Sequence, residues 1–132
     1  MQNFQPSNLL REPVANMCVG VICAETKDQA DRLALSRGLW RVMLEKGALG
    51  PYPTPEEAEA YPYTDLERRT AEKSRRMGIV GDPKFIRMGL ERIAAEHGVK
   101  EIMVVTICHD FAARLRSYEL IAREFGMAQP AA

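Results

Sequence analysis

The stretch EIMVVTICHDFAARLRSYELIAREFG, residues 101–126, decides the fold class of this chain. Its first seven residues are mostly apolar and rich in Val and Ile, which is typical of a strand buried on both faces. A polar turn follows at His109 and Asp110, and the rest predicts an amphipathic helix that ends at Gly126. Such a strand needs neighbouring strands and helices packed against it.

Two more strands with following helices are expected upstream. The apolar run ANMCVGVICA, residues 15–24, predicts a second buried strand, and Thr26 with Gln29 forms a capping-box pattern for a helix that ends at Gly47. A short edge strand is expected at 78–80, with Asp82 as the N-cap of the next helix. Strands alternating with helices predict an α/β fold with parallel strands and right-handed crossovers.

The remaining segments are expected to be less regular. We expect residues 1–13 to form an irregular lead-in, residues 48–63 a loop rich in Pro and Tyr, and residues 127–132 a tail. Thr64 and Glu67 form another capping-box pattern, which opens a highly charged helix that reaches about Arg76.

Composition excludes several classes of partner. The chain of 132 residues has the length of one domain, and its 18 basic residues balance its 18 acidic ones, so nothing favours nucleic acid or an anionic membrane. No apolar run is long enough to cross a bilayer. Three cysteines without framework spacing favour free thiols and a cytoplasmic location.

Three parallel strands are few for a complete sheet. With all helices expected on one side, they suit a partial TIM (β/α)8 barrel, in which this chain supplies about three of the eight βα units with the helices outside. Because the two sheet edges and the inner face would be apolar and uncovered, we expect a homo-oligomer or a partner that supplies the N-terminal part of the barrel.

Several motifs carry a resemblance to a known family. The segments FQPS, GVICAETKDQADRLALS, PTPEEAEAYPYT, IVGDP and MVVTICHDFAARLRSYELIA resemble the C-terminal part of luciferase-like flavin-dependent monooxygenases. The resemblance implies a TIM barrel, reduced FMN or a deazaflavin as cofactor, and oxygen and a small organic molecule as substrates. It also implies that the first five or so units are missing, so this portion would be inactive or weakly flavin-binding alone.

Two other interpretations of the whole chain stay open. It can be a non-enzymatic half-barrel scaffold or small-molecule-binding module that self-associates, or Met1 can be an internal start within a longer coding sequence.

Candidate site residues lie where strands end, because barrel active sites occupy the C-terminal ends of the strands. His109 is the first candidate for catalysis, as a hydrogen-bond partner of flavin or substrate or as a proton shuttle, and Asp110 is the second. The alternative is that both simply begin a helix, with Asp110 as cap and Arg114 as its ion-pair partner. The sequence identifies no cofactor-binding residue.

Other chemistries fit less well. Cys108 adjoins His109, but neighbours at a strand end point apart, which favours a passive thiol. Cys18 and Cys23 face opposite sides of a strand, so no metal site is expected. In the GIVGDPK turn Asp82 occupies the helix start, which makes the turn a cap rather than a phosphate site.

Two groups of side chains keep alternatives open. The arginines at 114, 116 and 123 form either a solvated helix face or a docking surface. The tyrosines at 52, 61 and 63 either cover a pocket or subunit contact, or anchor the loop that carries them.

Overall fold

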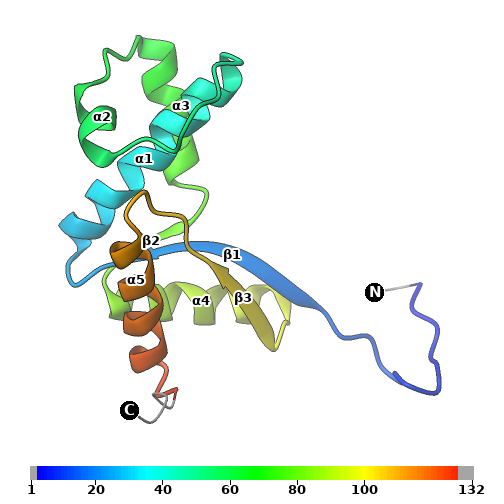
Figure 1. Ribbon diagram of the computed structural model, residues 1–132. Coiled ribbons are helices and arrows are strands. Elements are labelled where there is room, and N and C mark those ends of the chain that lie inside the picture. Colours follow the sequence, from blue (N-terminus) through cyan, green and yellow to red (C-terminus); the bar gives the residue numbers. More distant parts are fainter. Residues whose placement is uncertain (1–2, 128–132) are drawn as a thin grey trace.

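The computed structural model describes residues 3–127, so most of the expected tail at 127–132 lies outside the described residues. The elements follow in the order β1 (Asn16–Cys23), α1 (Lys27–Glu45), α2 (Pro55–Ala60), α3 (Asp65–Arg75), β2 (Ile79–Gly81), α4 (Pro83–His97), β3 (Glu101–Val105) and α5 (Phe111–Glu124). Figure 1 shows the sheet between α4 and α5 on one side and α1 with α2 and α3 on the other. Residues 3–15 contain no helix or strand.

The sheet is parallel and has the order β2-β1-β3. β3 pairs with the first part of β1, from Asn16↔Glu101 to Gly20↔Val105, and β2 pairs with its end, from Val21↔Ile79 to Cys23↔Gly81. The α/β class and the parallel pairing are therefore confirmed. β2 has only three residues and lies at an edge, as the sequence predicted.

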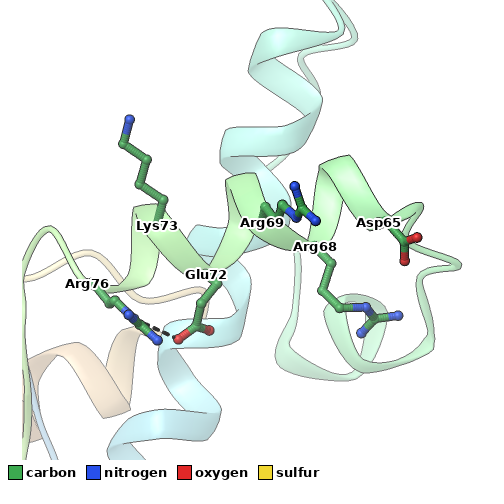
Figure 2. A pocket seen from close by; sticks show the side chains of 6 residues that line it. All are labelled: Asp65, Arg68, Arg69, Glu72, Lys73 and Arg76. Atoms are coloured by element: carbon green, nitrogen blue, oxygen red, sulfur yellow. Dashed lines mark hydrogen bonds and ion pairs between the residues drawn. The ribbon is translucent and has the colours of Figure 1, made fainter.

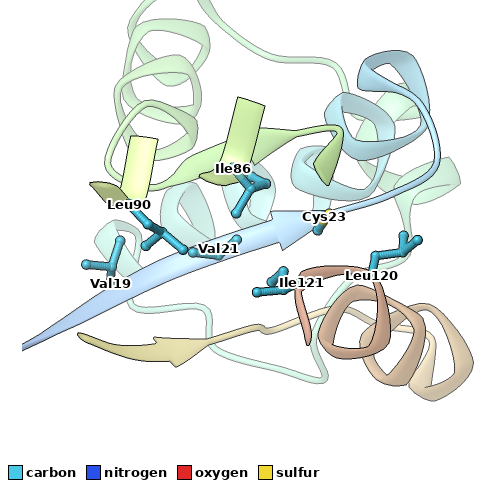
Figure 3. Packing of buried hydrophobic residues seen from close by; sticks show 7 residues of the cluster. All are labelled: Val19, Val21, Cys23, Ile86, Leu90, Leu120 and Ile121. Carbon is cyan, nitrogen blue, oxygen red and sulfur yellow. The ribbon is translucent and has the colours of Figure 1, made fainter. Parts of the chain in front are cut away.

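One face of β1 carries the main core. Val19, Val21 and Cys23 alternate along the strand and pack against Ile86 and Leu90 of α4 and Leu120 and Ile121 of α5 (Figure 3). Ile86 is completely buried. Since alternate side chains of a strand share a face, both α4 and α5 cover this one face.

The opposite face is covered only near the carboxyl end of β1. Ile22 and Ala24 pack there against Ala30 and Ala34 of α1. On β3 and the residues just after it, three apolar side chains remain exposed to solvent, with exposed fractions between 41% and 56%: Met103, Val105 and Ile107. This open face, with Cys18 beside it, is defined here as the open sheet face.

Two details differ from the expected barrel portion. Three consecutive barrel units would place β2 in the middle, whereas β1 is central, and α1 lies on the face opposite α4 and α5. The crossover from β1 to β2 and that from β2 to β3 run in opposite directions, so two right-handed crossovers place their helices on opposite faces. The strand patterns alone could not reveal the order.

The helix boundaries follow from caps that the sequence displays. Thr54 and Thr64 each begin a helix with a complete capping box, and Asp82 accepts from the Phe85 amide at 3.0 Å ahead of Pro83. Gly98 ends α4 at a φ of 63°, a left-handed conformation that glycine adopts without strain.

A search of the described helices found none with the length and apolar character needed to cross a membrane.

The buried position of Ile86 generates a stability prediction. Ile86→Ala should lower the free energy of unfolding by about 2–5 kcal/mol, because it leaves a cavity between α4 and β1. Met88→Ala on the same helix, 69% exposed, should change it by less than about 0.5 kcal/mol. Urea unfolding followed by circular dichroism measures both, and equal effects would contradict the packing described above.

Candidate functional site

Buried hydroxyl groups hold the carboxyl ends of β1 and β3 together. The Thr106 hydroxyl donates to the carbonyl of Val21 at 2.8 Å, and the amide of Cys23 donates to the Ser117 hydroxyl at 2.9 Å. The Tyr118 hydroxyl accepts from the Thr106 amide at 2.9 Å. Thr106 and Ser117 are both fully buried, so these bonds fix where the chain leaves β3.

His109 lies three residues beyond this network and is exposed. Its Nδ1 is 2.8 Å from the carbonyl oxygen of Tyr52. Because a carbonyl oxygen can only accept, Nδ1 carries the proton, and in the neutral ring Nε2 is then left with a free lone pair. The ring can therefore accept a hydrogen bond or a proton at Nε2 while the loop carbonyl holds its orientation.

Asp110 has the structural role that was the alternative interpretation. Its carboxylate accepts from the Ala113 amide at 2.8 Å and caps α5. The expected ion pair with Arg114 is not formed among the described residues; Arg114 donates its backbone amide to the Asp110 carbonyl instead. The structure thus brings His109, rather than Asp110, to a second element of the chain.

A cavity of about 420 Å³ lies on the open sheet face, and Tyr52 is among the residues that line it. Residues of β1, α1, the loop after α1 and the β3 segment line it, namely Cys18, Gly20, Val21, Ile22, Arg37, Trp40, Tyr52, Val105 and Ile107. It falls within the size range of small-molecule sites, and its walls are mainly apolar with few polar groups, as such sites usually are.

Tyr52 joins the cavity to His109. Its backbone carbonyl holds the His109 ring, its side chain lines the cavity, and its ring lies 6.4 Å from that of Trp40. Its buried hydroxyl has no hydrogen-bond partner among the described residues, and burial raises the pKa of Tyr52 to about 12. The phenol therefore remains a donor at neutral pH.

The other two tyrosines anchor the segment between α1 and α3. The ring of Tyr61 packs edge-on against Tyr63 with centroids 4.8 Å apart, and its hydroxyl donates to Glu67. Lys46 at the end of α1 forms an ion pair with the same carboxylate at 2.8 Å. Of the two roles considered for the tyrosines, Tyr52 thus lines a pocket, whereas Tyr61 and Tyr63 serve as anchors.

The other strand ends carry structural contacts. Glu25, after β1, binds the guanidinium of Arg116, and Asp82, after β2, caps α4. Arg116 is therefore a link between β1 and α5 and not merely a solvated side chain.

A larger hollow along α3 is a poor candidate for a site. It measures about 680 Å³, but its six charged lining residues belong to the face of one helix. Figure 2 shows Lys73 and Arg69 pointing one way and Arg68 and Arg76 another, with Arg76 bound to Glu72. Side chains that diverge do not enclose a ligand.

Cys108 has the properties of a passive thiol. It is partly buried, and burial together with the nearby Asp110 carboxylate raises its pKa to about 11. Since the thiolate is the reactive form, this position disfavours nucleophilic chemistry. No group of three or more side chains suited to bind a metal gathers among residues 3–127.

The sequence of the chain is similar to parts of longer proteins. No protein-family model matches it. It is 34% identical over 118 residues to a luciferase-like monooxygenase of Escherichia coli K12, a match that covers 89% of this chain and 35% of that protein. It is 36% identical over 124 residues to an uncharacterised Bacillus subtilis protein, YceB, covering 94% of this chain and 38% of that one.

A solved structure shares the fold. The crystal structure of apo-MsnO8 matches 96% of this chain with a TM-score of 0.82 and 31% sequence identity. These findings support a luciferase-like relationship. The chain spans between 35% and 39% of the length of these three relatives.

The sequence pointed to His109 as a candidate, but it did not indicate the hydrogen-bond partner of His109 or the residues of the cavity. The Tyr/Pro-rich loop was a signal that Tyr52 has a role, but only the fold shows that its carbonyl reaches His109. Arg37 and Trp40 lie in the segment expected to form a helix, and nothing in their spacing indicated a cavity.

The raised pKa of Cys108 predicts slow alkylation at neutral pH. At pH 8 a thiol with a pKa of about 11 is roughly one part in a thousand thiolate, so iodoacetamide should label Cys108 much more slowly in the folded chain than in urea-unfolded protein. Labelling of Cys108 should still accelerate between pH 9 and 11. Peptide mass spectrometry measures the labelling rates; equal labelling of Cys108 in folded and unfolded protein at pH 8 would refute the passive thiol.

Proposed function

We propose that this chain forms part of the active-site region of a luciferase-like flavin-dependent monooxygenase. The enzyme would use reduced flavin, FMN or a related deazaflavin, and oxygen to oxidise a small organic substrate. The observation that carries this proposal is the His109 ring beyond the carboxyl end of β3, which is held by the carbonyl of Tyr52, a residue that lines the cavity. The similarity to a luciferase-like monooxygenase of E. coli supports the reaction class.

The barrel architecture belongs to the same proposal. β1 with α4, and β3 with α5, have the form of two neighbouring barrel units, since the strands pair side by side and both helices cover one face. Residues 24–81 would then be an excursion from the end of β1 that carries α1, α2, α3 and β2. In that arrangement the open sheet face is the barrel interior, and this chain corresponds to the C-terminal portion.

The described residues fit the ring of a flavin but not its phosphate group. The free Nε2 of His109 can bond to a polar edge of the ring at the strand ends. A phosphate cradle is lacking there among residues 3–127, because the Asp82 carboxylate occupies the start of α4 and Pro83 has no amide hydrogen. The flavin phosphate would bind residues outside this portion.

Each described residue then has a limited task. When bound, reduced flavin supplies two electrons, which reduce one atom of oxygen to water while the other atom enters the substrate. His109 can accept or return a proton at Nε2, and the Tyr52 carbonyl keeps that nitrogen in place. The apolar walls of the cavity, among them Val105 and Ile107, exclude water around the substrate.

Flavin binding tests this function without measuring turnover. Equilibrium dialysis of the whole chain against FMN and, without oxygen, reduced FMN should show saturable binding. His109→Ala should weaken binding about tenfold, which corresponds to the loss of one hydrogen bond worth about 1.4 kcal/mol.

The other histidine supplies the control. His97 is exposed at the end of α4, so His97→Ala should leave flavin affinity unchanged. No saturable binding by the wild-type chain, or equal losses in the two variants, would count against the proposal and favour a binding module without redox chemistry.

The open sheet face predicts association of the isolated chain. Multi-angle light scattering should give a mass above the 14.8 kDa of one chain at micromolar concentration, because apolar Met103, Val105 and Ile107 are uncovered. Val105→Lys should shift the chain toward monomer, whereas Met88→Lys on α4 should not. A monomeric wild-type chain would argue against this role for the face.

A further inference from the structure

Arg37 differs from the other arginines that lie against the folded body. Arg37 is a partly buried residue at the wall of the cavity, and no carboxylate of residues 3–127 forms an ion pair with it. The other two partly buried arginines among residues 3–127, Arg75 and Arg116, both have acidic partners. A guanidinium that is partly removed from water without a counter-charge is an unfavourable arrangement unless an anion joins it.

Two glycines make room for this guanidinium. A methyl group added to Gly20 would lie 3.1 Å from Nη1 of Arg37, and one added to Gly78 would lie 2.8 Å from Nη1 and 2.6 Å from the carbonyl oxygen of Gly20. Neither glycine has a positive φ, so the close approach, and not backbone conformation, explains glycine there. Gly20 of β1 and Gly78, the residue before β2, thus leave space for the Arg37 guanidinium.

A second polar group lies in the same cavity without a partner. The buried hydroxyl of Tyr52 accepts and donates no hydrogen bond among the described residues, and Arg37 is close enough to favour the charged form of the phenol, which opposes the effect of burial on its pKa. A guanidinium fork and one hydroxyl donor match the two oxygens of a carboxylate. One cation does not balance the double charge of a phosphate in an apolar cavity.

We propose that Arg37 and Tyr52 bind the carboxylate of a small organic acid whose apolar body lies against Trp40, Ile22 and Val105. This deepens the proposed function, on which it rests for the substrate's role in the reaction, by naming the chemical class of the substrate. Binding of the acid itself needs no flavin, so the two proposals can fail separately. The cavity of about 420 Å³ admits an acid of the size of phenylacetate.

The test compares an acid with its neutral isostere. Trp40 is the single tryptophan of the chain and lines the cavity, so its fluorescence reports binding. Without flavin, and at a chain concentration below that of the association predicted above, phenylacetate should bind at least tenfold more tightly than phenylacetamide, and inorganic phosphate should not compete. Equal affinity for the amide, effective competition by phosphate, or no saturation by phenylacetate would overturn the proposal.

Single substitutions test whether Arg37 and Tyr52 cause the preference for the acid over the amide. Arg37→Gln should abolish the preference for the acid, and Tyr52→Phe should reduce affinity for the acid about threefold to tenfold. Arg41→Ala, one turn further along α1 and paired with Glu45, should retain it. Gly20→Ala, which crowds Nη1 of Arg37, should lower affinity for the acid more than for the amide. Retention of the preference by Arg37→Gln, with an unchanged melting temperature, would refute the assignment.

Discussion

The buried hydroxyl groups of Thr106 and Ser117 are the constraint on which the site depends. They bridge the carboxyl ends of β1 and β3 and the middle of α5, three elements that hydrophobic packing alone would leave free to slide. A buried hydroxyl has few alternative partners, so this arrangement has one favourable register. The chain leaves that fixed point at residue 107, and His109 is placed within reach of Tyr52 only because of it.

The excursion between β1 and β2 supplies the other half of the site. It is held through polar links: Lys46 and Tyr61 share the Glu67 carboxylate, and Arg32 binds Glu56 and Glu59 of α2. Exposed ion pairs of this kind stabilise weakly one by one. Their value here is positional, since they fix the loop that brings Tyr52 over the sheet. A chain can therefore keep a binding cavity on a face that its own helices cover only in part.

Local chemistry predicted much of this fold, and long-range contacts explain what it did not predict. The capping box at Thr64 and the caps at Asp82 and Asp110 all follow from short sequence patterns, and each is confirmed. The strand order is a property of crossover directions, which no single segment encodes. In α5, Phe111 and Leu115 are 72% and 50% exposed, and the buried residues are Ser117, Leu120 and Ile121, of which Ser117 belongs to the hydroxyl network.

The orientation of His109 is the point where fold and proposed chemistry meet, and nitrogen NMR of its ring tests it directly. With the ring neutral, the account predicts the tautomer protonated at Nδ1, with Nε2 as the unprotonated nitrogen, whereas exposed His97 should favour the tautomer protonated at Nε2. A His109 ring protonated at Nε2, like that of His97, would contradict the hydrogen bond to Tyr52 and remove the basis for a proton-handling role at this strand end.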